Sequence, residues 1–439
     1  MLRRCRNLKG KFKMKNRKKH IGIIVALSVF VTIIATGTVT VGAYSRFGGF
    51  GTGECADINE FSKYATELSE LTVPDNTQIF ALGEATHGNR EFQQLRLDVL
   101  RILAEKYGVR AFALEGDFGG CEAVNRYIHG GDGTAAEALS AVGFAIYRTE
   151  ETEQLVEWMR EYNESAPSGE DLRFYGFDMQ QRAYSYRCLL EIMKKNGIDT
   201  EEYEKMWNSE AGTYSEGCSA EQRAAILCSV KEQLPPDEVQ AVHFADVLLQ
   251  NIELGKYAND SAELNEHRDR MMAENVMWIL EQERARGNKC IMISGHNNHI
   301  MRCENGGVSV LGGLLSEKLS GGYFAVGTDF RRSVCNLPKP YTGKRITHTF
   351  YSRDPLANAS KKCGFDVSFL DFSKVPSDSA LTEYLENNIS MGSLGEAYSV
   401  LMNFVPRSYR VSRTPRSSFD AMIFVSSATP IEIKTAADK

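Results

Sequence analysis

Several motifs that mark common enzyme classes are missing from this sequence. There is no G-x-S-x-G nucleophile elbow, which disfavours a covalent serine mechanism. There is no Walker P-loop and no G-x-G-x-x-G after a predicted strand, which disfavours nucleotide chemistry. The helical zinc motif H-E-x-x-H is also absent. Ten cysteines occur but no C-x-x-C pair, so we expect no zinc ribbon or redox dithiol and interpret the cysteines as packing residues.

Acidic residues are absent from the first 20 positions, which contain ten Lys or Arg. The remainder carries 41 basic and 57 acidic residues, a formal net charge of −16, which argues against nucleic acid as a partner. Residues 21–44 contain no charge at all. An apolar stretch of this length can cross a bilayer as a helix, with the flanking Lys and Arg on the cytoplasmic side.

We therefore predict a single-pass protein of the cell membrane whose catalytic domain lies outside the cytoplasm. The predicted parts are a basic cytoplasmic segment (1–20), a transmembrane anchor (21–44), a Gly-rich linker (45–56) and an α/β domain (57–439). The lipid bilayer is then a partner through the anchor. The alternative is a cleaved signal peptide, because residues 41–43 resemble a small-residue cleavage site.

Apolar runs and helical patterns alternate along the domain, which predicts an α/β fold. The runs typical of buried strands are 78–83, 109–115, 172–177, 289–294 and 323–326. A helical pattern is present over 59–70. Another, over 90–107, joins the first two of these runs into a βαβ unit, which implies a parallel sheet. The predicted fold class is a mostly parallel central sheet flanked by helices, with a helical insertion at 181–287 and an N-terminal transmembrane helix. FDVSFLDF and DAMIFV extend the sheet or form a hairpin, and we expect a loose tail from residue 430.

Each of four predicted strands ends in ionisable residues. These are Glu84 and His87, then Glu115 and Asp117, then Asp178, and finally His296 and His299. In an open α/β sheet, ligands bind beyond the carboxyl ends of the strands. We therefore expect carboxylates and histidines to meet at one edge, where acid/base chemistry is possible.

The candidate residues suggest particular roles in such chemistry. His87 can take a proton from water while Glu84, three residues earlier, fixes its tautomer. Arg96 can keep nearby carboxylates ionised or hold an oxyanion. Glu115 can orient His87 or act as the base itself, and the His296/His299 pair can bind a metal. The structural alternatives are helix capping by Glu84, His87 and Asp117, and a surface position for Arg96.

These elements, in this order, resemble the erythromycin esterase family over roughly residues 57–430. The matching pieces are GEATHG (83–88), Arg96, FALEGD (112–117), RTEETEQLVEWMREYN (148–163), FYGFDMQ (174–180), RDRMMAENVMWI (268–279) and SGHNNHI (294–300). The resemblance implies hydrolysis of an ester, in the name-giving members a macrolactone, without a covalent intermediate. It implies that His87 is the general base, supported by Glu84, Arg96, Glu115, His296 and His299. Asn298 and Tyr147 stand where many members carry Ala and Trp.

The leading hypothesis is a membrane-anchored hydrolase that cleaves a small-molecule ester or lactone with water activated by His87, without a cofactor. The first alternative is a metal-dependent hydrolase that uses the same residues as ligands. The second is a tethered protein without enzymatic activity that binds an extracellular, haem-like small molecule through its histidines.

Overall fold

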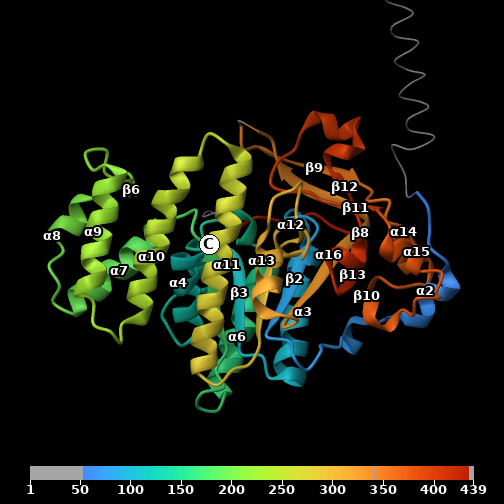
Figure 1. Cartoon of the computed structure of the whole chain (residues 1–439), viewed down its shortest axis with the longest axis horizontal. Helices are drawn as coiled ribbons and strands as arrows, with labels where there is room; N and C mark the ends of the chain where they lie inside the picture. The colour runs from blue at the N-terminus through green and yellow to red at the C-terminus, as the bar shows by residue number, and fades with distance from the viewer. Residues whose placement is uncertain (1–52, 341, 435–439) are drawn as a thin grey trace, which may run out of the picture.

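The computed structural model describes residues 53–340 and 342–434, with a nine-stranded sheet at the centre (Figure 1). The sheet order is β1-β10-β13-β8-β2-β7-β3-β4, with β9 paired to β8. The strands are β1 Ala65–Thr66, β2 Ile79–Glu84, β3 Ala111–Asp117, β4 Arg173–Asp178, β7 Ile291–His296, β8 Tyr323–Pro338, β9 Arg345–Phe350, β10 Val367–Asp371 and β13 Ala421–Ala428. Neighbours from β13 to β4 are parallel, whereas β1, β10 and β9 pair antiparallel. The predicted mostly parallel sheet is therefore present.

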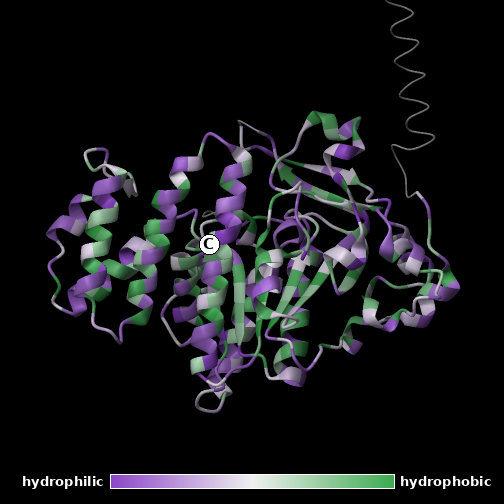
Figure 2. Cartoon of the chain, in the orientation of Figure 1, coloured by the Kyte–Doolittle hydropathy of each residue, from purple (hydrophilic) through white to green (hydrophobic). Residues whose placement is uncertain are grey.

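The central strands are buried on both faces, which is why they read as continuous apolar runs. Along β2, Ile79 and Ala81 join one core cluster, whereas Phe80 and Leu82 join another on the opposite face. Helices α11 (Ser261–Ala285) and α13 (Leu311–Leu319) contribute to the first cluster. Helices α3 (Arg90–Tyr107) and α6 (Glu150–Ser165) contribute to the second. Figure 2 shows hydrophobic residues along these strands and polar residues on the outer helices.

Between β4 and β7 the chain forms a group of helices at the side of the sheet (Figure 1). These are α7 Ala183–Lys195, α8 Glu201–Lys205, α9 Ala220–Gln233, α10 Val239–Leu254 and α11, with a two-stranded pair of β5 Trp207–Asn208 and β6 Thr213–Tyr214.

The helices that follow strands of the sheet also include α4 Phe118–Ile128 after β3 and α12 Asn297–Ile300 after β7. A hairpin of β11 Ile389–Gly392 and β12 Arg410–Arg413 forms a separate small sheet. All nine cysteines in the described residues are free.

The predicted fold class needs one correction, which concerns its transmembrane helix. Among the helices that the structure describes, none is long and apolar enough to cross a membrane. The longest of them, α3 and α11, carry charged residues throughout, because only one face of each packs against the sheet. The predicted basic segment, the span at 21–44 and the linker up to residue 52 lie outside the described residues.

Two local predictions also differ from the structure. The helix expected to extend to residue 70 ends at Tyr64, because Ala65 and Thr66 pair with β10 as an edge strand; tertiary pairing here overrides helical propensity. The tail expected to be loose is packed as far as Lys434. The Ile431 N–H donates to Gly88 O at 3.1 Å, and Lys434 pairs with Glu150 and Glu153 at 2.6 Å each. The tail therefore supports the turn that carries His87.

Candidate active site

Four neighbouring strands bring the predicted residues to one edge of the sheet. The order β2-β7-β3-β4 sets side by side the carboxyl ends that carry Glu84, His296, Glu115 and Asp178. Glu84 and His296 are direct partners in the β2–β7 register. His299 lies one turn further on, in α12. The structure thus gathers residues that are up to 215 positions apart in the sequence, from Glu84 to His299.

The Glu84 carboxylate accepts hydrogen bonds from both His87 and Arg96. The His87 Nδ1–H donates to Glu84 Oε1 at 2.6 Å, and Arg96 Nη2 donates to Glu84 Oε2 at 2.6 Å. The Arg96 side chain is 1% exposed, lies over the ring of Tyr147 and donates from Nε to Ser294 Oγ at 3.2 Å. Arg96 is therefore not a surface residue. Its contacts hold the Glu84 carboxylate in place.

The contact with Glu84 sets the tautomer of His87. Because the carboxylate accepts the Nδ1 proton, the neutral imidazole has its unprotonated nitrogen at Nε2. Burial lowers the pKa of His87, but the charge and hydrogen bond of Glu84 outweigh burial and raise that pKa above its usual value. The side chain of His87 is 13% exposed. Nε2 of His87 is thus a base that water can reach.

His296 lies beside His87, and its neutral ring is the opposite tautomer. The two ring centroids are 4.9 Å apart. His296 Nδ1 accepts from the backbone N–H of Asn298 at 3.2 Å, so the proton of the neutral ring is on Nε2. Burial, then the neighbouring His87, lowers the pKa of His296 well below its usual value. Its buried Nε2 has no hydrogen-bond partner among the described residues, which leaves a free donor beside the base.

A second network surrounds Glu115 and is organised by Arg268. Arg268 Nη2 donates to Glu115 Oε1 at 2.8 Å and to Asp178 Oδ2 at 2.7 Å, and Nη1 donates to His299 Nε2 at 3.1 Å. Glu115 Oε2 accepts the backbone N–H of His296 at 2.7 Å. Burial would raise the pKa of Glu115, but the charges of His299 and Arg268 hold it well below its usual range. Glu115 thus fixes the backbone of His296 and is not placed to orient His87.

Sequence reasoning missed Arg268 and Asp269 as parts of the site. The His299 Nδ1–H donates to Asp269 Oδ1 at 2.8 Å, and Asp269 is buried. Both residues come from α11, a helix rather than a strand end. One signal was available in the sequence. Arg268 and Asp269 stand one turn of α11 before Met272, and Met272 and Val276 belong to the buried face of that helix. A charge on an apolar helical face is rarely left without a partner.

Asp117 stands apart from these networks. It is the N-cap of α4 and accepts the backbone N–H of Gly120 at 2.6 Å. Burial raises the pKa of Asp117 to about 7. The capping role that the sequence offered as an alternative is therefore the one observed.

Several of the histidine nitrogens that could bind a metal are engaged in other contacts, whereas within the described residues Nε2 of His87 and Nε2 of His296 are not. Both nitrogens of His299 are bonded, to Asp269 and Arg268, and Nδ1 of His87 is bonded to Glu84. The Arg268 guanidinium also lies against His299. Within residues 53–340 and 342–434, no group of three or more His, Cys, Asp or Glu is arranged to hold a metal ion. Nε2 of His87 and Nε2 of His296 are two nitrogen donors, fewer than the three protein ligands typical of a catalytic zinc site.

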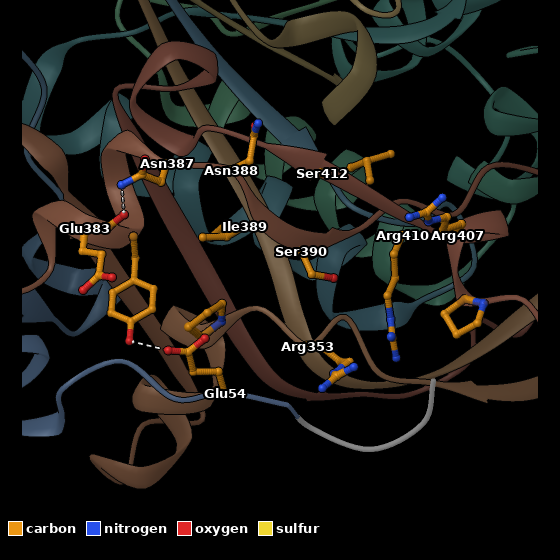
Figure 3. A pocket seen from close by; sticks show the side chains of 14 residues that line it. Glu54, Arg353, Glu383, Asn387, Asn388, Ile389, Ser390, Arg407, Arg410 and Ser412 are labelled. Atoms are coloured by element: carbon orange, nitrogen blue, oxygen red, sulfur yellow. Dashed lines mark hydrogen bonds between the residues drawn. The ribbon is translucent and has the colours of Figure 1, made fainter. Parts of the chain in front are cut away.

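A cavity of about 550 Å³ is lined by other residues than those of this cluster; Figure 3 shows its side chains. It lies against the β11–β12 hairpin and is lined by residues of both charges, among them Glu54, Glu383, Arg407 and Arg410. The Tyr384 hydroxyl, also in the wall, donates to Glu54 Oε1 at 2.9 Å. None of the six predicted site residues lines this cavity. Access to the cluster is instead through the partly exposed side chains of His87 and His299, the latter 16% exposed.

The contact between Glu84 and His87 predicts a shift in the pH dependence of any activity that uses His87 as a base. A base works only when unprotonated, so kcat/KM should fall as the pH drops through the raised pKa of His87. In Glu84→Gln the charge that raises this pKa is gone, so the acid limb should move to lower pH. Values of kcat/KM measured from about pH 5 to pH 9 check this shift. If the acid limb has the same position in wild type and variant, protonation of His87 is not its cause.

Comparisons with known proteins give consistent relatives. The sequence model of the family described as "Erythromycin esterase" matches residues 104–428. "Erythromycin esterase type II" of Escherichia coli is 26% identical over 352 residues, which cover 69% of this chain and 82% of that protein. "Putative hydrolase YbfO" of Bacillus subtilis (strain 168) is 24% identical over 260 residues, 51% of this chain and 56% of that protein.

Two solved structures share the fold. A succinoglycan biosynthesis protein superimposes with a TM-score of 0.71 at 20% identity, covering 86% of this chain and 98% of its own. A mutant of the erythromycin esterase EreC in its open conformation superimposes with a TM-score of 0.56 at 18% identity, covering 87% of this chain and 96% of its own. At these identities the structural likeness concerns the fold alone.

Proposed function

The chain belongs to the erythromycin esterase family, and on this premise we propose that it hydrolyses an ester or lactone of a small molecule with water activated by His87. One observation carries the proposal. The base nitrogen of His87, whose side chain is 13% exposed, and the buried Nε2–H of His296, which has no hydrogen-bond partner among the described residues, belong to rings whose centroids are 4.9 Å apart. A base beside a donor without a partner is the pair that attack on a carbonyl requires.

The proposed reaction begins with proton transfer from water to His87 Nε2. The resulting hydroxide attacks the carbonyl carbon of the ester, and the carbonyl oxygen gains negative charge as the tetrahedral intermediate forms. The Nε2–H of His296 donates to this oxyanion, which stabilises it. The intermediate then breaks its bond to the alcohol oxygen, and His87 returns the proton to that oxygen. Carboxylic acid and alcohol leave, and the base is restored.

The buried ion pairs have a positioning role in this scheme. Arg96 fixes the position of the Glu84 carboxylate, and Glu84 stabilises the imidazolium that His87 becomes during the reaction. Arg268 keeps Glu115 ionised, and Glu115 holds the backbone of His296. Neither arginine is assigned a contact with the substrate's carbonyl.

Attack by water without a covalent intermediate predicts that no acyl group is transferred to the protein. With a 4-nitrophenyl ester, release of nitrophenol should be linear from the first turnover. The intact mass of enzyme quenched during turnover should equal that of the free chain. A burst equal to the enzyme concentration, together with an added acyl mass, would contradict the proposed mechanism.

A further inference from the structure

A cavity of about 560 Å³ in the helical insertion carries positive charge without a carboxylate in its wall. Its cationic residues are Arg182, Arg223 and Lys256, and Tyr214 and Gln180 also line it. We call it the arginine pocket. It is lined by residues of β6, the start of α9, the end of α10, the start of α11 and the segment that precedes α7. The cavity of Figure 3 also holds arginines, but it includes Glu54 and Glu383.

The two guanidinium groups of the arginine pocket lie over one aromatic ring. The central carbons of Arg182 and Arg223 are 5.3 and 4.6 Å from the centroid of the Tyr214 ring. Arg223 Nη2 donates to the backbone oxygen of Ser215 at 2.8 Å. The buried Nε atoms of both arginines have no hydrogen-bond partner among the described residues. The ring and the backbone contact thus hold the two cations in place.

The described residues provide little negative charge for these cations. Neither arginine forms an ion pair within the described chain, although acidic residues outnumber basic ones by 57 to 51 in the whole sequence. Glu221 lies near Lys256, and the Lys256 charge adds to the hydrogen bonds that lower the pKa of Glu221. A planar guanidinium with free donors matches the oxygen atoms of a carboxylate or phosphate.

The arginine pocket adjoins the network around Arg268. Gln180, in the pocket wall, donates from Nε2 to Asp178 Oδ2 at 2.8 Å, the same oxygen that accepts from Arg268 at 2.7 Å. Leu264, also in the wall, precedes Arg268 by one turn of α11. Asn251 Nδ2 donates to the Gln180 backbone oxygen at 3.0 Å and fixes this boundary.

From these contacts we propose that the arginine pocket binds an anionic group, a carboxylate or a phosphate, carried by the ester substrate. This inference rests on the proposed hydrolase function and narrows its substrate class to esters with an acidic substituent. The reacting carbonyl lies between His87 and His296, and the anionic group lies beyond Gln180, against Arg182 and Arg223.

Matched esters test the inference in the full chain. We expect 4-nitrophenyl monoesters of adipic and suberic acid to be cleaved with kcat/KM about tenfold to a hundredfold above their neutral primary amides. The double variant Arg182→Met/Arg223→Met should lose this preference through a higher KM for the acids, with cleavage of the amides unchanged. Arg187→Met, which removes an exposed arginine outside the pocket on the same helix as Tyr184, is the control and should keep the preference.

Binding of inorganic phosphate, measured by calorimetry, separates this inference from the proposed function. Phosphate bound by the wild type and by Arg187→Met, but not by the double variant, supports the pocket even if no ester is cleaved; that result would count against the hydrolase alone. Equal cleavage of acids and amides by the wild type at both chain lengths overturns the inference. So does phosphate binding that survives the loss of both arginines in a variant with wild-type circular dichroism.

Discussion

Replacing His87 with Asn is expected to abolish ester hydrolysis while the fold stays intact. The amide can still donate to Glu84, as the Nδ1–H of His87 does at 2.6 Å, so the buried carboxylate keeps a partner. What is lost is the unprotonated Nε2, the only group in the proposed reaction that takes a proton from water. Loss of a positioned base costs about a hundredfold to ten-thousandfold in rate.

The measurement is kcat/KM on an ester that the wild type cleaves, together with the midpoint of thermal unfolding. His129→Asn is a matched control, because His129 is bonded to Asn125 O and Asp171 on the protein surface, at the far end of α4. We expect that control to retain activity. Turnover close to the wild-type value in His87→Asn would remove His87 from the role of base and end the proposed mechanism.

Among the substitutions proposed for this protein, Arg268→Met is expected to cause the largest decrease in the free energy of unfolding. The guanidinium is the shared partner of the buried carboxylates of Glu115 and Asp178, at 2.8 and 2.7 Å. Removing one partner of a buried ion pair leaves an uncompensated charge and costs about 3–5 kcal/mol of folding free energy. Arg270→Met is the comparison, since Arg270 pairs at 3.3 Å with Glu253 on the surface and should cost about 1 kcal/mol or less.

The loss in Arg268→Met should depend on pH in a defined direction. In the wild type the pKa of Glu115 is depressed, so its contribution to stability is present above the pKa of the unfolded carboxyl and is lost as the pH falls. In the variant Arg268 no longer lowers the pKa of Glu115, while His299 still opposes the effect of burial, so folded Glu115 takes up a proton at a higher pH than it does in the wild type. The gap in unfolding free energy between wild type and variant should therefore narrow as the pH falls from 7 to about 3. Urea denaturation at both pH values measures it; a constant gap would show that lost packing, not charge, is the cause.

The local pattern of the sequence was sufficient to predict the sheet and its reactive edge. Buried parallel strands read as short apolar runs, and a βαβ unit has one favoured handedness. Glu84, Glu115, Asp178 and His296 follow such runs directly, so their meeting at one edge follows from the strand positions. His87 and His299 lie within three residues of these strand ends, so their positions follow from those of the strands. The same local reading was insufficient for residues 65 and 66, where pairing with β10 replaced a helix.

The choice of partners within the site depended on the tertiary structure. That Arg96 is enclosed against Glu84, that Arg268 joins two carboxylates and that Glu115 binds the backbone of His296 depend on distances between segments far apart in the chain. The arginine pocket likewise combines residues of five separate segments, none of which shows a binding motif. Sequence periodicity records which side of an element is buried, because burial repeats along the chain. It does not record which hydrogen bonds form across the core, because each depends on the packing of several elements at once.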